Sequence, residues 1–425
     1  MKFIYADSLD YVDPGFDFVN DNYSEGRRPY WDDAYPHEIL GYAPYDGILV
    51  SRATVGDHIA TGKYTQAQAM RFRREGGRKF LRFDGEKNKD KLLFGDCGSF
   101  SYAKATKPPY TPEDTVEFYS DGKFTHGCSI DHIIFEFDES VKNMAGGNEV
   151  SRDRFELTLE LAEQFLKASK SLSNFTPVGV AQGWSPDSLA ESASRLEKMG
   201  YDYIAIGGLV PLRIHQIHSA VNAVHNKVGS HVRIHLLGFG KADNLHEFTI
   251  YPKIASFDTT SPLLRAFKDN RKNYYLPNGS NSLDYYTAIR IPQAMENNHL
   301  KRLVCAGKYN QEKLIQMEQR ALKLIRAYDL GEADINTTLD SIIEYTYPLH
   351  WKPAVSQESL EKKIVTLRGY YEKTLSDRPW KKCNCPICSE ISVEVIIFRG
   401  SNRNKRRGIH NLAVFHKHLK ETHVI

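Results

Sequence analysis

The chain has 425 residues, of which 41% are hydrophobic and 26% are charged, and its formal net charge is +3. This composition is typical of a globular protein, and the length suits one large domain with an appendage or two to three average domains. No apolar run approaches the roughly 20 residues of a membrane helix, and the N-terminus has no signal-peptide core. The sequence therefore excludes a helical membrane protein, and we expect a cytoplasmic location.

Eight short stretches rich in Ile, Val, Leu or Phe are predicted to be strands. They do not alternate strictly between apolar and polar residues, as is typical of strands buried on both faces. In chain order they are Lys2–Asp7, Asp46–Ala53, Leu92–Phe100, His132–Asp138, Pro177–Trp184, Tyr203–Leu209, Val232–Gly238 and Ile254–Asp258.

Helical patterns separate several of these strands. Arg152–Lys170 has an apolar stripe, Pro186–Met199 begins after the cap residue Ser185, and Leu212–Val228 is a third candidate. Strands alternating with helices over residues 1–262 predict an α/β fold, a (β/α)8 barrel. A doubly wound open sheet is the alternative, but it more usually has fewer strands and a glycine-rich dinucleotide loop, which is missing here.

The predicted strands end in polar or small residues. A barrel of this kind carries its chemistry at the C-terminal ends of its strands, so these residues would share one rim and could bind a polar heterocycle. Each could instead be a turn residue or a helix cap. The strand ends are Asp7, Ser51, Asp96, Asp138, Gln182, Gly207, Gly208 and Asp258.

Residues 263–375 are predicted to be a mainly helical insertion, with a clear helix at Gln311–Tyr328. Before that helix, Arg271–Tyr275 and Asp284–Arg290 interleave aromatic and basic residues. This pattern is typical of base stacking and phosphate contact with a nucleic acid. It is equally typical of tyrosines that pack beneath a loop.

The C-terminal segment, residues 376–425, contains a C-x-C-x-x-C pattern formed by Cys383, Cys385 and Cys388. Cysteines spaced so closely favour a metal site over a disulfide framework, with free or redox cysteines as the alternative. Three thiolates need one more donor to close a tetrahedral zinc site, and a closed site would be structural, not catalytic. The candidate fourth ligands are His410, His416, His418 and His423.

A basic run in the same segment includes Arg403, Lys405, Arg406 and Arg407. Such a run is often only a solvated surface. Together with the zinc subdomain it could instead contact phosphates, and that contact would be sensitive to salt.

Seven segments, taken in order, resemble motifs of the tRNA-guanine transglycosylase superfamily. The family is a (β/α)8 barrel with a C-x-C-x-x-C…His zinc subdomain, and it exchanges guanine in a polynucleotide for a 7-deazaguanine base. The segments are Phe94–Phe100 (family D-S-G-G-F), Phe137–Glu139 (F-D-E), Val180–Gly183 (V-Q-G), Ile206–Leu209 (G-G-L), Leu236–Gly240 (M-G-V-G), Ser256–Asp258 (M-F-D) and Ile409–Leu412 (I-H-N-L).

The resemblance implies a role for each matching residue. Asp258 becomes the nucleophile and Asp96 the acid/base aspartate, while His410 becomes the fourth zinc ligand. The remaining matches, which would bind the base, are Asp138, Gln182, Gly207, Gly208 and Leu209.

Departures from the bacterial queuosine enzymes suggest a particular branch. Val210-Pro211-Leu212 replaces a V-G-E whose glutamate serves an aminomethyl group, so the neutral nitrile base preQ0 fits better than preQ1. The N-terminal Asp7–Pro14 and the Tyr/Arg-rich insertion resemble the DpdA-type branch, which places 7-deazaguanine in DNA.

We therefore expect an enzyme that exchanges guanine in DNA for preQ0 through a covalent aspartyl-nucleotide, with structural zinc and with possible partner proteins of a DNA-modification system. The same exchange on tRNA is the first alternative. A non-catalytic nucleic-acid-binding subunit of this fold is the second, although the presence of both Asp96 and Asp258 argues against it. A zinc-dependent hydrolase or glycosylase that releases the base to water is the third.

Overall fold

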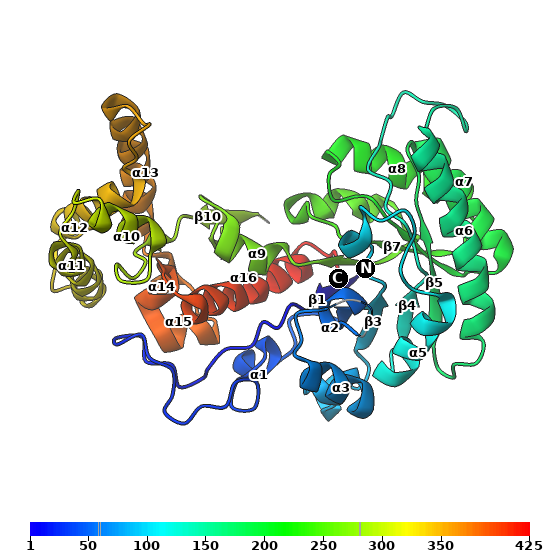
Figure 1. Ribbon diagram of the computed structural model, residues 1–425, viewed down its shortest axis with the longest axis horizontal. Coiled ribbons are helices and arrows are strands. Elements are labelled where there is room, and N and C mark those ends of the chain that lie inside the picture. The colour runs from blue at the N-terminus through cyan, green and yellow to red at the C-terminus, as the bar shows by residue number, and fades with distance from the viewer. Residues whose placement is uncertain (58, 60, 280–281) are drawn as a thin grey trace. The chain divides into compact units, whose positions relative to one another are not determined.

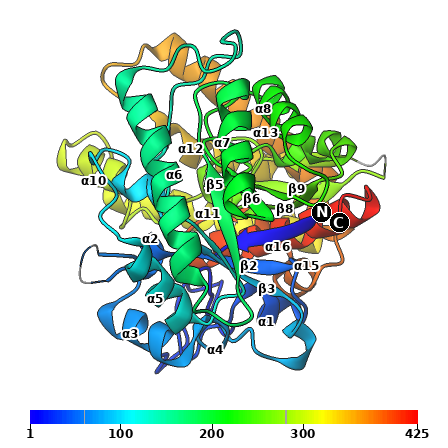
Figure 2. The same cartoon turned by 90° about the vertical axis from the view of Figure 1, so that its right-hand side faces the viewer.

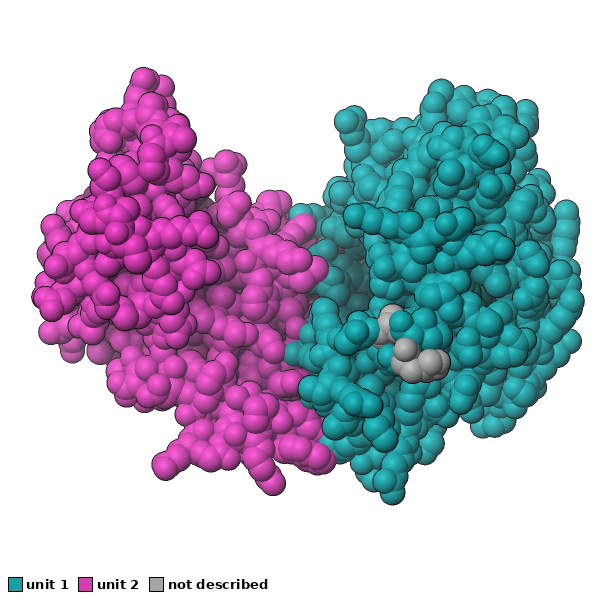
Figure 3. Space-filling model, viewed as in Figure 1, with its two compact units in different colours: residues 1–9, 45–261, 419–425 teal, residues 10–44, 262–418 magenta. Residues whose placement is uncertain are grey.

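The computed structural model describes residues 1–57, 59, 61–279 and 282–425 (Figure 1). They form two compact units (Figure 3): residues 1–9, 45–261 and 419–425 make up the first, and residues 10–44 and 262–418 the second. The chain leaves the first unit at Ser261, after the eighth strand. Residues 262–418, which include the expected helical insertion and most of the C-terminal segment 376–425, share the second unit with residues 10–44.

The first unit is a closed barrel of eight parallel strands, which confirms the predicted fold class. The strand order follows the chain, and pairing of Ile4 with Asp258 is part of the contact that closes the barrel. The strands are β1 (Lys2–Ala6), β2 (Gly47–Ser51), β3 (Leu92–Asp96), β4 (His126–Cys128), β5 (Thr176–Ala181), β6 (Tyr203–Ile206), β7 (Arg233–Leu236) and β8 (Ile254–Thr259).

The fourth strand differs from the prediction. We expected His132–Asp138, but β4 is His126–Cys128, and residues 129–138 have no regular secondary structure. Gly127 carries no strand signal, yet a Cβ there would lie 2.5 Å from the Tyr119 ring, so the close packing requires glycine. The apolar run after it fits strand composition, but pairing with β3 and β5 decides which segment enters the barrel.

Helices follow most of the strands and cover the barrel, and Figure 2 shows α6 and α7 outside β5 and β6. The predicted helix Pro186–Met199 is found with those bounds as α7, where Ser185 accepts a hydrogen bond from the Ser188 amide. The α-helices of this unit are α2 (Arg52–Val55), α3 (Gln66–Glu75), α4 (Gly77–Phe80), α5 (Pro112–Gly122), α6 (Glu149–Ser169), α7 and α8 (Ile214–Lys227).

The barrel interior is filled by one cluster of side chains that includes Ile4, Leu49, Phe94, Val180 and Tyr203. The two ends of the chain meet at this unit, where the Met1 ammonium donates to the Val424 carbonyl oxygen at 2.8 Å. Short 3₁₀ helices complete the unit at Glu86–Asn88, Ser99–Tyr102 and Ala242–Ile250.

The second unit is mainly helical. Its strands form two small pairs: β9 (Tyr274–Pro277) with β10 (Leu283–Tyr286), and β11 (Ile289–Arg290) with β12 (Ile397–Phe398). A 3₁₀ helix spans Ser392–Ile396. The α-helices are α1 (Pro36–Leu40), α9 (Ser261–Lys268), α10 (Asn298–Cys305), α11 (Gln311–Leu330), α12 (Ile335–His350), α13 (Gln357–Asp377), α14 (Pro379–Lys382), α15 (Pro386–Ile391) and α16 (Ser401–Glu421), of which α9 and α16 continue into the first unit.

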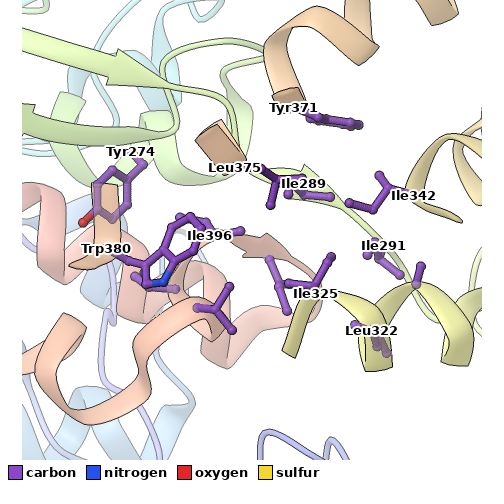
Figure 4. Close-up of a cluster of buried hydrophobic side chains, with 14 of the residues drawn as sticks. Tyr274, Ile289, Ile291, Leu322, Ile325, Ile342, Tyr371, Leu375, Trp380 and Ile396 are labelled. Carbon is purple, nitrogen blue, oxygen red and sulfur yellow. The ribbon is translucent and has the colours of Figure 1, made fainter. Parts of the chain in front are cut away.

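One apolar core explains why this unit is not divided at residue 375. Figure 4 shows Ile325 of α11, Ile342 of α12 and Leu375 of α13 in the same cluster as Trp380 and Ile396 of the metal-binding segment. Helices that share a buried core cannot separate without exposing it to water. Tyr274, Tyr275 and Tyr286 are also buried, so these tyrosines follow the packing interpretation.

The basic run of α16 is buried inside the second unit. Arg403 pairs with Glu394 at 2.9 Å and also contacts Asp21. Arg407 donates to the Ala266 carbonyl oxygen at 2.7 Å, and all three arginines of the run are fully buried.

Since Arg403, Arg406 and Arg407 are fully buried and donate to carboxylates and carbonyl oxygens of their own unit, the expectation that they contact phosphates is wrong. Lys405 is half-buried and donates to the Tyr11 carbonyl oxygen at 3.0 Å. Buried arginines of this kind need internal partners, and here several of those partners come from residues 10–44. These contacts explain why the N-terminal segment belongs to this unit.

Among the residues that the structure describes, none of the helices combines the length and apolar character needed to cross a bilayer.

Candidate active site

Three carboxylates and an amide gather at the C-terminal ends of four barrel strands. Asp96 is the last residue of β3, Asp131 follows β4, Gln182 follows β5 and Asp258 lies in β8. Gln182 and Asp131 are 1% exposed and Asp258 is 6% exposed. Buried polar groups at this rim of a parallel barrel are typical of a catalytic site.

Asp258 is oriented by two donors on one of its oxygens. Its Oδ1 accepts from the Gly238 amide at 2.7 Å and from His235 Nε2 at 3.0 Å. Its Oδ2 accepts no hydrogen bond from any described residue. The carboxylate is therefore fixed in position by one oxygen while the other remains available as a nucleophile.

His235 belongs to a buried chain of hydrogen bonds. Its Nδ1 lies 2.6 Å from Ser256 Oγ, and Ser256 Oγ lies 2.6 Å from the Tyr203 hydroxyl. Since Asp258 is an acceptor, a neutral His235 must donate through Nε2 and accept from Ser256 through Nδ1, which fixes its tautomer. Its ring also stacks on Phe94, with centroids 4.7 Å apart, so both packing and hydrogen bonds orient it.

Asp131 and Gln182 form the second half of the site. Gln182 Nε2 donates to Asp131 Oδ2 at 2.6 Å, and Cys97 Sγ donates to Asp131 Oδ1 at 3.1 Å. Burial raises the pKa of Asp131, and the hydrogen bonds that it accepts offset part of this effect. Asp131 and Gln182 are thus joined in one buried, hydrogen-bonded pair at the barrel mouth.

Asp96 has the properties of a group that exchanges protons near neutral pH. Loss of hydration, followed by the negative charge of Asp131, raises its pKa from 3.8 to about 7. Hydrogen bonds from Ser51 and from the Gly98 amide, the latter at 3.1 Å, oppose the shift. A carboxylic acid with this pKa can both give and take a proton at physiological pH.

The glycine pair after β6 lets the backbone approach Gln182. A Cβ at Gly207 would lie 2.4 Å from Gln182 Nε2, and Gly208 has a φ of 72°, in the left-handed region that favours glycine. Leu209 is buried beside them. The structure thus brings Gln182 and the predicted Gly-Gly-Leu segment together.

Asp138 does not join this cluster. Its carboxylate is exposed and accepts hydrogen bonds from the Ser140 amide at 2.9 Å and the Ser140 hydroxyl at 2.7 Å, which lower its pKa. The carboxylate next to Gln182 is Asp131, which the sequence analysis did not single out. The F-D-E match placed the base-binding acid at residues 137–139, whereas the acid that follows β4 is Asp131.

His235 was also missed, although the sequence contains a signal for it. It is a polar residue within the apolar strand prediction Val232–Gly238 and is fully buried. A buried histidine in a strand needs a partner, and here that partner is Asp258.

In the second unit, Cys383, Cys385, Cys388 and His410 bring four donor atoms within 4.8 Å of one another. His410 Nδ1 lies 3.6, 3.3 and 3.3 Å from the three sulfurs. A tetrahedral zinc ion would separate its nitrogen ligand from each sulfur by about 3.5 Å. The four residues therefore fit a metal ion such as zinc.

The outer contacts of His410 support the same conclusion. Its Nε2 donates to the Tyr275 carbonyl oxygen at 2.8 Å, which leaves Nδ1 as the electron-pair donor, and its ring stacks on Tyr274 at 3.9 Å. Such partners orient metal-binding histidines. The alternative fourth ligands His416, His418 and His423 are not part of the cluster.

Comparison with known proteins finds similarity in the part of the chain that contains this site. A family model described as queuine tRNA-ribosyltransferase matches residues 64–269, which contain all the carboxylates described above. A DNA-guanine transglycosylase of Salmonella montevideo is 40% identical, and the match covers 99% of this chain and 97% of that protein. The chain belongs to the tRNA-guanine transglycosylase superfamily and resembles its DpdA-type branch. It is an enzyme of the pentosyltransferase class.

The raised pKa of Asp96 predicts a pH-dependent stability. Between pH 4 and 7 the folded chain retains a proton that the unfolded chain has released, so the free energy of unfolding falls as pH rises through this window. Asp96→Asn should match the wild type near pH 4 and exceed it near pH 8 by on the order of 1–3 kcal/mol, a range reduced because Asp96 is partly exposed. Denaturant unfolding at a series of pH values measures this difference.

Asp138→Asn is the matched control. The pKa of Asp138 is lowered, so its contribution to stability is present at neutral pH and lost as the pH falls below its ordinary range. The two variants should therefore change stability in opposite directions at pH 8. A difference between Asp96→Asn and the wild type that stays constant with pH would contradict the prediction.

Proposed function

We propose that the protein exchanges guanine in DNA for a 7-deazaguanine base, with preQ0 as the favoured base. The observation that carries the proposal is the pairing of two different carboxylates in one barrel mouth. Asp258 is oriented by Gly238 and His235 with Oδ2 unengaged, and Asp96 has a pKa of about 7. Two carboxylates with separate roles are what glycosidic exchange requires.

In the first step, Asp258 Oδ2 attacks C1′ of the target guanosine nucleotide. The new O–C1′ bond replaces the C1′–N bond, and the electron pair of the broken bond leaves with guanine. Neutral Asp96 donates a proton to the departing base. The product is a covalent aspartyl-nucleotide in which the DNA backbone is intact.

In the second step, the incoming base reverses the process. Its ring nitrogen attacks C1′ and displaces Asp258, while the ring N–H proton returns to Asp96. Every proton and electron pair is balanced between the two bases, so the reaction needs neither ATP nor a redox cofactor. The same two residues therefore serve both directions.

We further propose that Asp131, in place of Asp138, binds the polar edge of the base. Its hydrogen bond with Gln182 at 2.6 Å and its location after β4 support this role. Gln182 and the Gly208 amide would then meet the base oxygen. Since a base within a duplex cannot reach the barrel mouth, the target nucleotide must be flipped out or presented single-stranded.

DNA is preferred to tRNA as the polymer because the Salmonella montevideo relative, named for DNA, matches almost the whole chain. Exchange on tRNA is the second candidate, favoured by the description of the matching family model. Release of the base to water, as in a glycosylase, would need an activated water, and Asp258 is instead oriented as a nucleophile.

Nucleoside mass spectrometry tests the reaction and the polymer together. After incubation with preQ0, we expect 7-deazaguanine in digests of duplex DNA and not in digests of tRNA. Asp258→Ala should lower the rate by roughly 10³-fold or more while the fold is retained. Incorporation into tRNA alone would overturn the choice of DNA, and abasic sites without incorporation would replace exchange by hydrolysis.

We propose that the Cys/His cluster holds a structural zinc ion. Cys385→Ser should remove one zinc per chain and lower the unfolding temperature by roughly 10 °C, because a closed metal site contributes its binding energy to folding. Cys305→Ser is the control, since Cys305 is an exposed cysteine outside the cluster. Metal analysis and thermal unfolding measure both effects. Loss of activity by mild chelation without unfolding would instead indicate a catalytic metal.

His235 is proposed as a positioning residue that acts through Asp258. His235→Ala leaves the Gly238 amide as the remaining described donor to Asp258, so kcat should fall by roughly 10- to 100-fold while KM for DNA stays constant. His235→Gln, whose amide can still donate, should recover part of the rate. Tyr203 lies at the far end of the hydrogen-bond chain that runs through Ser256 to His235, so Tyr203→Phe should change kcat less than His235→Ala. Steady-state kinetics separate these effects, and a change in KM alone would contradict the role.

A further inference from the structure

The second unit contains a cavity of about 300 Å³ that the proposed chemistry does not use. Its walls come from the loop at residues 269–273, the segment 287–290, the end of α12, one face of α13 and Phe398 of β12. Every lining residue belongs to the second unit, so the cavity is complete within it. A volume of this size falls at the lower end of the range for ligand pockets.

The cavity is strongly basic. Arg271, Arg290 and Lys363 line it, all three are exposed, and none forms an ion pair with a described carboxylate. Asp269 is the one acid among the described lining residues, and its Oδ1 already accepts from the backbone amides of Arg271 and Lys272 at 2.7 and 2.8 Å.

His350, at the end of α12, lines the same cavity and is affected by the positive charges of its basic residues. Burial, followed by the positive charges of Lys363 and Arg290, lowers its pKa from 6.5 to about 4. His350 is therefore neutral at physiological pH, and the positive potential comes from the two arginines and the lysine. Unpaired cations grouped in a concave surface attract anions and concentrate them there.

Aromatic rings orient both guanidinium groups. Arg271 lies over the Tyr370 ring at 5.2 Å from its centroid, and Arg290 lies over the Phe398 ring at 4.4 Å. Stacking of this kind fixes the plane of a guanidinium while its N–H groups remain free to donate. Oriented guanidinium groups bind phosphate through paired, charge-assisted hydrogen bonds.

These cations differ from the basic run of α16. Arg403 and Arg407 donate to carboxylates and carbonyl oxygens of their own unit and are fully buried. Arg271 and Arg290 come instead from the two aromatic-basic stretches, whose buried tyrosines support the loop. The nucleic-acid interpretation of those stretches thus applies to their arginines, and the packing interpretation to their tyrosines.

We infer that this cavity binds phosphate groups of the DNA backbone, an inference that rests on the proposed function. Cations interleaved with aromatic side chains favour a nucleic acid over a simple inorganic anion. A contact of this type would supply affinity that is sensitive to salt and independent of base sequence.

The test is the affinity for a fluorescein-labelled DNA duplex, measured by fluorescence anisotropy over a range of salt concentrations. Arg271→Ala, Arg290→Ala and Lys363→Ala should each weaken binding by roughly 3- to 10-fold. Each should also reduce the slope of log affinity against log salt by up to about 1. Arg290→Lys, which keeps the charge but not the paired donors, should lose less than Arg290→Ala.

Lys301→Ala and Arg302→Ala are matched controls, since both residues are exposed on α10 and outside the cavity lining. They remove the same charge and should leave affinity and slope nearly unchanged. Thermal unfolding of each variant reports whether the unit remains folded, and Arg290→Lys supplies a second, conservative change at the same place.

Two competition arms identify the source of the phosphate. Free dGMP and inorganic phosphate should displace the duplex only at concentrations far above that of the DNA. Equal affinity in the cavity and control variants would overturn the inference, as would loss of dGMP binding with DNA affinity intact. The base-exchange assay of the wild type does not depend on the anisotropy measurement. A cavity that does not bind DNA can therefore be distinguished from a protein that does not catalyse the proposed exchange.

Discussion

Crowding of carboxylates in the mouth of a closed barrel is the constraint on which the chemistry of this protein depends. Asp96 and Asp131 share a poorly hydrated space, and their mutual repulsion adds to the loss of hydration in raising the pKa of Asp96 to about 7. The surroundings of Asp258 differ from those of Asp96, because Gly238 and His235 donate hydrogen bonds to one of the Asp258 oxygens. One barrel rim thus holds a carboxyl group that titrates near neutral pH and a carboxylate that is fixed through one of its oxygens.

The orientation of Asp258 extends well below the rim. His235 is stacked on Phe94, and Phe94 is stacked in turn on His126, so aromatic packing inside the barrel fixes His235, which in turn orients Asp258. Ser256 and Tyr203 complete the hydrogen bonds on the other side of His235. The barrel core therefore contributes to the geometry of the candidate active site as well as to the stability of the barrel.

The second unit shows how one composition can serve two purposes. Its arginines divide into a buried group on α16, which donates to internal carboxylates and carbonyl oxygens, and an exposed group around the cavity, which lies over aromatic rings. Residue type does not distinguish them, since both groups consist of arginines in basic stretches of the sequence. Burial inside the unit, in part against residues 10–44, makes the first group structural, and an open cavity leaves the second available to a ligand.

The sequence by itself indicated the barrel, a polar rim at its strand ends and a metal site at the three cysteines, because these follow from short-range patterns of burial and spacing. The resemblance to family motifs then implied Asp258 as the nucleophile, Asp96 as the acid and His410 as the fourth ligand. Only the tertiary structure decided that Asp131 and not Asp138 lies beside Gln182, that His235 contacts Asp258, and that Arg403 and Arg407 are internal. The physical reason is that these contacts join strands and segments far apart in the chain, and strand pairing and burial, which no local pattern encodes, set which side chains meet.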